Sequence, residues 1–306
     1  MNKILFNSNP QIPMIESKLP NIGTTIFTVM SALATKTNAI NLGQGFPDFD
    51  CDPVLINKVE ESMKAGHNQY PPMIGIPELR NEIAEKIKNL YKHSYNPDTE
   101  ITITAGGTQG IFTVIIACVR PGDEVIVIEP AYDSYVPAIK LAGGIVIPVQ
   151  MQISTNEASK EKSYQIPWIA LKNAISNKTR LIIINTPHNP TGMIWGKDDL
   201  GKFADLLDGT NILVCSDEVY EHMVYDNHDH QSASSHPKLV NRSFIVSSFG
   251  KTFHVTGWKV GYVVAPADLM NEFRKTHQFN VFTVNTPMQY GMAAYLKNPE
   301  PYLALP

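Results

Sequence analysis

Short, continuously apolar segments recur along this 306-residue chain and alternate with stretches of helical periodicity. A strand with one face in water alternates apolar and polar residues, whereas a strand covered on both faces is apolar throughout. The continuous runs therefore predict an α/β fold, in which a mostly parallel central sheet carries helices on both faces. The predicted strands are Ile101–Thr104, Glu124–Ile128, Leu181–Ile184, Asn211–Cys215, Phe244–Val246 and Gly261–Val264.

Two helices are predicted between these strands. Pro77 suits the first position of a helix, where its missing N–H group costs nothing. A second helix is predicted to start near Thr108 and to run through Val119. The apolar residues that share one face of the first helix are Leu79, Ile83, Ile87 and Leu90.

Charge and cysteine content exclude several classes of protein. The formal net charge is −4 and the basic residues form no stripe, which excludes a nucleic-acid partner. No apolar stretch approaches the length of a transmembrane helix, so we expect no membrane partner. Cys51, Cys118 and Cys215 are widely spaced, which favours a reducing, cytoplasmic setting over a disulfide framework or a zinc site. We interpret His228-Asp229-His230 as an exposed loop, and expect no metal.

Polar or glycine-rich turns follow most of the predicted strands. Because the carboxyl ends of parallel strands meet at one edge of a sheet, these turns are expected to converge on a ligand. The turns are Gly106–Thr108, Glu129–Tyr132, Asn185–Gly192, Ser216–Tyr220 and Ser247–Lys251.

The last of these turns contains a lysine in a small-residue segment, Ser247-Ser248-Phe249-Gly250-Lys251-Thr252, and a second lysine, Lys259, follows eight residues later. A glycine-permitted turn allows the backbone, and with it an amine, to approach a ligand closely. The second cation suits a phosphate and helps to hold Lys251 neutral and nucleophilic. An aldehyde and a phosphate on one ligand describe pyridoxal 5'-phosphate.

Other residues fit this cofactor, although each has an ordinary structural interpretation. Asp217 suits a protonated pyridine nitrogen, but it also suits a helix N-cap. Tyr220 and Tyr132 suit a ring oxygen and a stacked ring, or simply a packed core. The Gly107 turn suits a phosphate or only a change of chain direction. Asn185 and Asn189 have Asx turns as their alternative, and Lys259 a surface position. The combination at strand ends favours the cofactor.

Several motifs together resemble the class I pyridoxal-phosphate aminotransferases of fold type I. The resemblance runs from about Lys18 to the C-terminus and is closest to the kynurenine/glutamine-type subgroup. It implies a large cofactor-binding domain and a small domain. The segments that carry it are Leu19–Phe27, Asn41–Phe49, Gln69–Arg80, Asn185–Gly192, Ser216–Tyr220 and Ser247–Gly261.

The resemblance implies a role for each catalytic residue. Lys251 binds the cofactor aldehyde covalently and then moves the α-proton of the substrate. Asp217 pairs with the ring nitrogen. Asn189 and Tyr220 donate hydrogen bonds to the ring oxygen, with Asn185 close by.

It also implies the remaining contacts of cofactor and substrate. Tyr132 stacks on the cofactor ring, and Gly45 and Asn189 meet the substrate's α-carboxylate. Because one residue crosses from a second subunit, the resemblance implies a homodimer with a shared active site. The phosphate contacts are Gly107, Thr108, Ser248 and Lys259, with Tyr70 from the second subunit.

Three parts of the chain are expected from the resemblance. Residues 1–40 form an N-terminal arm and part of the small domain, 41–282 the large domain, and 283–306 the start of a C-terminal small domain whose remainder, with its carboxylate-binding arginine, is absent. The expected activity is transfer of an amino group from methionine, or an aromatic or glutamine-like amino acid, to a 2-oxo acid. The alternatives are a carbon–sulfur β-lyase of the same fold and a truncated, non-catalytic cofactor-binding remnant.

Overall fold

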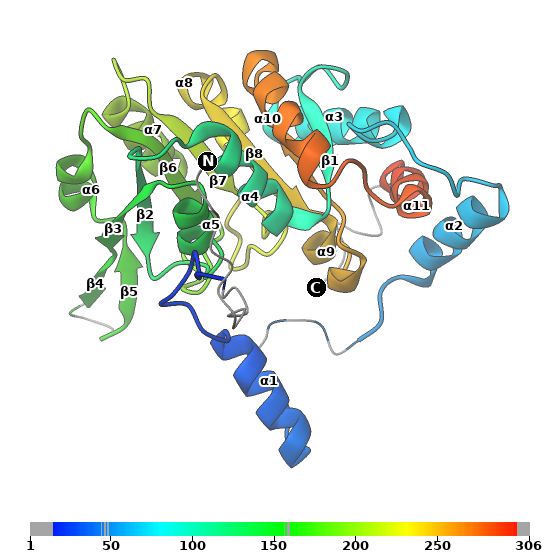
Figure 1. Cartoon of the computed structure of the whole chain (residues 1–306), viewed down its shortest axis with the longest axis horizontal. Helices are drawn as coiled ribbons and strands as arrows, with labels where there is room; N and C mark the ends of the chain where they lie inside the picture. The colour runs from blue at the N-terminus through cyan, green and yellow to red at the C-terminus, as the bar shows by residue number, and fades with distance from the viewer. Residues whose placement is uncertain are drawn as a thin grey trace, which may run out of the picture.

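The computed structural model describes residues 15–43, 45, 47, 49–155, 157 and 160–298. Its centre is a seven-stranded sheet in the order β1-β9-β8-β7-β6-β2-β3 (Figure 1). Strand β9 runs antiparallel to both neighbours, and the other neighbouring strands are parallel. The strands of this sheet are β1 Ile101–Thr104, β2 Glu124–Glu129, β3 Ile145–Gln150, β6 Thr179–Asn185, β7 Leu213–Asp217, β8 Ser243–Ser248 and β9 Gly261–Val264.

Helices cover both faces of this sheet, as the apolar runs predicted. Alternate residues of each strand point to opposite sides of the sheet, so a continuous apolar run needs cover on both. In β2, Val125 and Val127 belong to a buried cluster that includes residues of α4, α5 and α10, whereas Ile126 and Ile128 belong to another that includes residues of α3, α6 and α7. The helices are α1 Ile26–Thr37, α2 Pro53–Lys64, α3 Pro77–Tyr91, α4 Gly106–Cys118, α5 Tyr135–Leu141, α6 Trp168–Ala174, α7 Lys197–Leu206, α8 Pro237–Val240, α9 Phe249–Thr252, α10 Ala267–Asn280 and α11 Thr286–Leu296, with 3₁₀ turns η1 Ala233–Ser235 and η2 Thr256–Trp258.

All six predicted strands belong to the central sheet, but the sequence patterns missed three others. Strand β3 lies at the sheet edge and contains Pro148, which is typical of edge strands and weakens a strand pattern. The hairpin of β4 (Gln152–Thr155) and β5 (Lys162–Gln165) is exposed at every residue, so it carries no burial signal. Of the four apolar residues predicted on one face of the first helix, Leu79, Ile83 and Ile87 are buried, whereas Leu90, near the end of α3, is 40% exposed.

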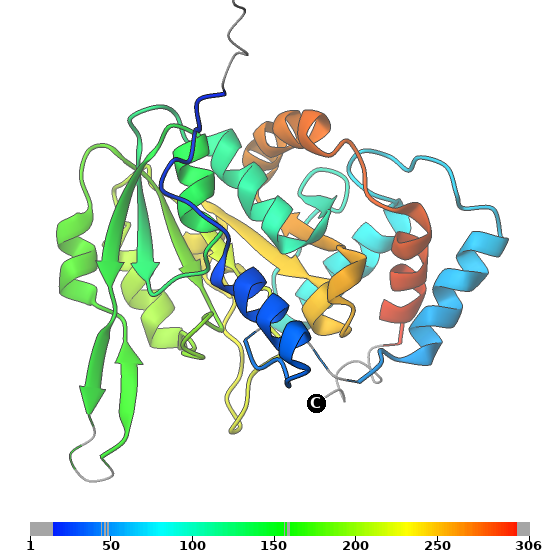
Figure 2. The ribbon, with the colours of Figure 1, turned by 60° about the horizontal axis from the view of Figure 1, so that its bottom comes forward.

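Two helical elements lie beside the sheet rather than on it. Helix α1 has no buried residue and extends away from the main body in Figure 1, and Figure 2 shows it from a second direction, in front of that body. Helix α2 packs against α11 so closely that a Cβ atom on Gly291 would lie 2.4 Å from Cγ2 of Val59. Within the described ranges, no helix combines the length and the apolar character needed to cross a bilayer. The division of the chain at residues 40 and 282 stays a prediction.

Candidate active site

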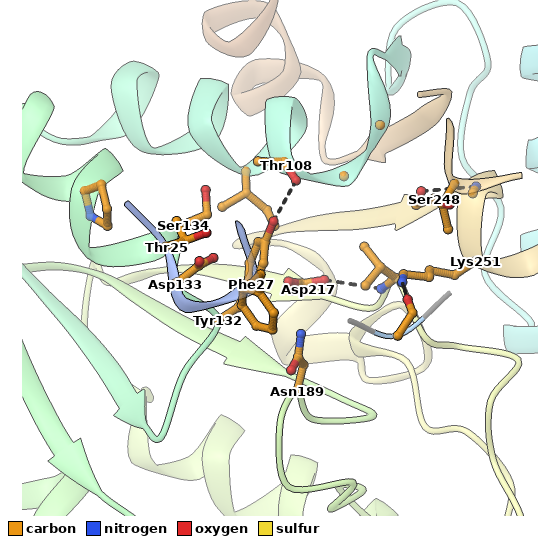
Figure 3. Close-up of a pocket in the computed structure, with 18 of the residues that line it drawn as sticks. Thr25, Phe27, Thr108, Tyr132, Asp133, Ser134, Asn189, Asp217, Ser248 and Lys251 are labelled. Carbon is orange, nitrogen blue, oxygen red and sulfur yellow. Dashed lines mark hydrogen bonds between the residues drawn. The ribbon is translucent and has the colours of Figure 1, made fainter. Parts of the chain in front are cut away.

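A pocket of about 1110 Å³ opens at the carboxyl ends of the strands, and all five predicted turns contribute to it (Figure 3). It is lined by ten of the twelve residues that the sequence suggested. Asn185 and Tyr70 are the two exceptions. The ten are Gly45, Gly107, Thr108, Tyr132, Asn189, Asp217, Tyr220, Ser248, Lys251 and Lys259.

The turn that carries Lys251 leaves β8 and enters the short helix α9 directly. Ser248 is the N-cap of this helix, and its hydroxyl accepts a hydrogen bond from the Gly250 N–H group at 3.2 Å. A Cβ atom at position 250 would lie 3.1 Å from Cα of Thr256, so the close turn favours glycine. The strand, the cap and the glycine together direct Lys251 into the pocket.

The Lys251 amine lies among polar groups of the pocket (Figure 3). Its Nζ donates a hydrogen bond to the carbonyl oxygen of Gly45 at 3.2 Å and lies 5.2 Å from the ring centroid of Tyr220. Burial, and then the positive charge of Lys259, lower the pKa of Lys251. A lowered pKa increases the neutral fraction of the amine, which is the nucleophilic form.

Asp217 is the last residue of β7 and is buried, with 2% of its surface exposed. Its carboxylate accepts hydrogen bonds from the Tyr135 hydroxyl at 2.5 Å and from the Val219 N–H group at 3.3 Å. Burial raises the pKa of Asp217 to about 6, although both hydrogen bonds act in the opposite direction. Among the described residues, no cationic side chain forms an ion pair with this carboxylate.

Glycines and a cation meet where the chain enters α4. Gly106 has a φ of +80°, and a Cβ atom there would lie 3.4 Å from Nζ of Lys259. A Cβ atom on Gly107 would lie 2.6 Å from Cγ1 of Val219, so no larger residue fits without displacing that side chain. Free N–H groups at a helix N-terminus, a hydroxyl from Thr108 and a nearby ammonium group form a donor set for a phosphate.

Hydrogen bonds connect the polar side chains that surround the pocket. The hydroxyl groups of Thr108 and Tyr132 lie 3.1 Å apart (Figure 3). On the other side, the Asn189 amide donates to the Tyr220 hydroxyl at 3.5 Å. These contacts hold the Tyr132 ring and the polar groups of Thr108, Asn189 and Tyr220 around the space between Asp217 and Lys251.

Asn185 is buried behind the pocket rather than exposed in it. Its amide donates to the Asp217 carbonyl oxygen at 2.8 Å and its side-chain oxygen accepts from the Asn189 N–H group at 2.6 Å. These contacts position two pocket residues, and a direct contact of Asn185 with a cofactor stays a prediction. Tyr70 lies elsewhere, 82% exposed, with its ring 5.4 Å from that of Phe282.

Sequence reasoning missed the N-terminal side of the pocket and a residue that lies behind the pocket. The N-terminal segment 21–28 lines the pocket, including Ile22, Ile26 and Phe27. Its resemblance to the family was a signal, but no role followed from it because nothing local indicates where an exposed arm packs. Tyr135 was also missed, since its partner Asp217 is 82 residues away in the sequence.

The interpretation of His228-Asp229-His230 as exposed loop was wrong for His230. Its side chain is 5% exposed, and Nε2 lies 3.0 Å from a carboxylate oxygen of Glu218. The chain folds back after β7 and buries this ring, which a local polar pattern does not reveal. Over the described ranges there is no cluster of three or more histidine, cysteine or acidic residues able to hold a metal ion.

Comparisons with known proteins agree with this geometry. The profile of the family Aminotransferase class I and II matches residues 37–303. A methionine aminotransferase of Escherichia coli is 48% identical, over 98% of this chain and 75% of its own length. A probable N-succinyldiaminopimelate aminotransferase of Mycobacterium tuberculosis is 36% identical, over 95% of this chain and 72% of its own.

A solved structure gives the same result. The E. coli protein YbdL, for which a methionine aminotransferase function was identified, has a TM-score of 0.89 at 47% identity and matches 97% of this chain and 75% of its own. The chain therefore spans about three quarters of the length of these relatives. With its fold, its pocket and its sequence similarity taken together, this chain belongs to the class I and II aminotransferase family of pyridoxal-phosphate-dependent enzymes.

Proposed function

We propose that the pocket around Lys251 binds pyridoxal 5'-phosphate and transfers the amino group of an amino acid to a 2-oxo acid in two half-reactions. The observation that carries this proposal is the convergence of five strand-end turns on one amine of lowered pKa. The cofactor, when bound, supplies an aldehyde that takes up the amino group and a protonated ring that stabilises negative charge at the substrate's α-carbon.

The residues present fit this cofactor at both of its ends. The N-terminus of α4 with Gly107, Thr108, Ser248 and Lys259 offers donors and a positive charge to a phosphate. At the other end, the buried carboxylate of Asp217 has hydrogen-bond donors but no cationic partner in the part of the chain that the structure describes. A protonated ring nitrogen supplies that missing charge.

Lys251 has two roles in this proposal. Its neutral amine would hold the cofactor through the aldehyde, and burial with the nearby Lys259 charge favours that neutral form. With the substrate bound, the same amine would act as the general base and acid that holds and moves the proton of the substrate's α-carbon. Tyr220, whose ring lies 5.2 Å from Nζ, donates its hydroxyl to the ring oxygen together with Asn189.

Asp217 is the electrostatic partner in the same proposal. Its ionised carboxylate keeps the ring nitrogen protonated, so that negative charge developing at the α-carbon is stabilised. Tyr132 would hold the ring by stacking, and in this structure its hydroxyl lies 3.1 Å from that of Thr108. Asn185 supports both sides of the ring by holding Asn189 and the end of β7.

The substrate we propose is methionine, or an aromatic or glutamine-like amino acid. Ile22, Ile26 and Phe27 give the pocket an apolar side that suits an uncharged, elongated side chain. A relative at 48% identity is a methionine aminotransferase. Gly45 and Asn189 are the proposed contacts of the α-carboxylate.

We further propose a homodimer with a shared active site. Phe279 and Tyr70 are 91% and 82% exposed in the single chain. Exposed large aromatic side chains of this kind are typical of surfaces that a partner covers. In this assembly Tyr70 reaches the phosphate of the second subunit. Sedimentation equilibrium of the holoenzyme is expected to give twice the mass of one chain.

Because all three cysteines are free thiols, we also propose a cytoplasmic location.

Borohydride reduction of the cofactor-loaded protein, followed by peptide mapping, tests the central assignment. The label is expected on Lys251, and Lys251→Ala is expected to lose the visible cofactor band and at least about 10²-fold in turnover with methionine and a 2-oxo acid. Lys202→Ala, at an exposed lysine of α7, is the matched control and should behave as wild type. Label on another residue contradicts the proposal. Release of ammonia and pyruvate from cystathionine would indicate the β-lyase instead.

A further inference from the structure

Tyr135 lies directly behind the Asp217 carboxylate and has no part in the contacts described above with the cofactor. It is the first residue of α5, and its side chain is buried, with 2% exposed. Its hydroxyl donates to Oδ2 of Asp217 at 2.5 Å. Within the described residues this is the sole side-chain hydrogen bond to that carboxylate, since the other donor is the Val219 backbone.

The direction of this hydrogen bond follows from the chemistry of both groups. Burial, and then the charge of Asp217, raise the pKa of Tyr135 well above its ordinary value, so the phenol keeps its proton. A phenol that donates to a carboxylate stabilises the ionised form of the acid. Burial acts in the opposite direction on Asp217 and favours its neutral form. Tyr135 therefore offsets part of the cost of keeping a charge at the end of β7.

The surroundings of Asp217 make this donor important. The ionisable groups that face it are, apart from Tyr135, either neutral hydroxyls and thiols or another acid, so none supplies a positive charge. They are Tyr132 from the segment before α5, Cys215 of β7, and Glu218 and Tyr220 from the turn after β7.

Tyr135 also contacts the residue proposed to stack on the cofactor. The rings of Tyr132 and Tyr135 are edge to face, with centroids 5.6 Å apart and an interplanar angle of 83°. One buried side chain thus fixes the position of Asp217 through its hydroxyl and that of Tyr132 through its ring. Neither contact requires Tyr135 to touch the ligand.

We propose that Tyr135 is a positioning residue, whose hydroxyl holds the Asp217 carboxyl group ionised and fixed in rotation so that it can receive a cationic ring nitrogen. The part of this inference that concerns the ring nitrogen rests on the proposed function, whereas the effect of Tyr135 on the Asp217 carboxyl group does not. A protein without cofactor should already show it, because the hydrogen bond is present within the chain.

The test is Tyr135→Phe, with the ionisation of Asp217 followed by infrared difference spectroscopy of ¹³C-aspartate-labelled apoprotein against Asp217→Asn. A hydrogen bond to a charged group corresponds to a shift of about one to two pH units, so the Asp217 pKa is expected to rise by that amount. The affinity for pyridoxal phosphate should fall about tenfold near pH 6.5 and change little near pH 9, where the carboxyl group is ionised in both proteins.

Tyr95→Phe is the matched control. Tyr95 is equally buried, at 4% exposure, but its hydroxyl lies 3.3 Å from that of Ser234, away from the pocket. It should leave the ionisation of Asp217 unchanged. If Tyr135→Phe folds poorly, 3-fluorotyrosine at position 135, a more acidic phenol of nearly the same size, is expected to shift the Asp217 pKa downward.

The outcomes separate this inference from the proposed function. An Asp217 pKa that moves in neither variant, or an affinity loss that is equal at all pH values, overturns the role of Tyr135. A shifted Asp217 pKa in the apoprotein, together with no borohydride label at Lys251 after incubation with pyridoxal phosphate, supports the role of Tyr135 as a donor and removes the proposed function instead.

Discussion

Asp217 and Glu221 are buried carboxylates four residues apart, but they lie on opposite faces of the sheet and have opposite surroundings. Glu221 pairs with Lys86 at 2.5 Å and accepts hydrogen bonds from the hydroxyls of Tyr91, Ser247 and Tyr262. Although burial alone raises its pKa, the charges of Lys86 and His222 and the hydrogen bonds from Lys86 and Ser247 hold it below its usual range. Asp217 accepts hydrogen bonds from the phenol of Tyr135 and from a backbone N–H group, and its pKa is raised.

The difference separates a structural acid from a functional one. A buried charge that the chain neutralises by itself has no capacity left for a ligand, and the fold depends on its partner because the charge is costly without it. A charge that the chain only partly stabilises retains electrostatic energy that a bound cation releases. The burial of the two groups is similar, at 2% and 4% exposure, so the number and charge of their partners make the distinction.

The largest expected effect is a loss of stability when the ion pair of Glu221 is broken. Lys86→Met leaves the Glu221 carboxylate buried without its cation, and is expected to lower the free energy of unfolding by about 3 to 5 kcal/mol. Urea unfolding of the apoprotein measures this. The control is Lys58→Met, which removes an exposed pair with Glu61 and should cost less than about 1 kcal/mol. Equal losses in the two variants would remove the distinction between the buried and the exposed pair.

The next effect is on the functional side. Asp217→Asn keeps the shape of the side chain and removes its charge, so turnover should fall on the order of 10²- to 10³-fold. The unfolding free energy of the apoprotein should stay the same or rise. Glu221→Gln should do the reverse, with lower stability and a normal rate per folded molecule. Steady-state kinetics with active-site titration checks both, and a variant that loses both properties would contradict the separation.

The smallest effect concerns pH, where the two acids have opposite signs. The folded pKa of Asp217, about 6, lies above its ordinary value of 3.8. Its contribution to stability is therefore fully present below pH 3.8 and is lost as the pH rises through 6. For Glu221, whose pKa is lowered, the contribution is present above 4.5 and is lost as pH falls through the folded value.

Asp217→Asn should therefore gain stability relative to wild-type apoprotein between about pH 4 and about pH 7.5, by up to about 3 kcal/mol. Denaturant titrations at the two pH values measure this difference. A constant difference between the variant and the wild type would show that Asp217 titrates normally in the folded chain.

Much of the fold was predictable because burial leaves local marks. Continuous apolar runs such as Leu181–Ile184 identified central strands, and all six predicted runs lie in one sheet. The edge strand β3 was missed although Ile145–Val149 is apolar, because Pro148 interrupts its strand pattern, and the exposed β4–β5 hairpin left no such mark. The reversed direction of β9 was also not predictable, since an apolar run has the same pattern in either direction.

The candidate site was predictable where backbone and chemistry coincide in a short segment. The turn around Lys251 and the end of β7 at Asp217 are both local, and the structure brings them to one pocket. The roles of the pocket residues stay predictions that the experiments above test. The N-terminal segment 21–28 was not predictable, because an arm with no buried helix residue has no pattern that indicates its neighbours.

The amino-acid sequence by itself determined which segments are buried strands, where the strand-end turns lie, and which of them carry an amine, a carboxylate or paired glycines. These properties depend on neighbouring residues, and local spacing encodes them. Only the tertiary structure decided which acid is neutralised, because Tyr135 reaches Asp217 across 82 residues and Lys86 reaches Glu221 across 135. Such contacts depend on the order and direction of strands, which no local pattern contains.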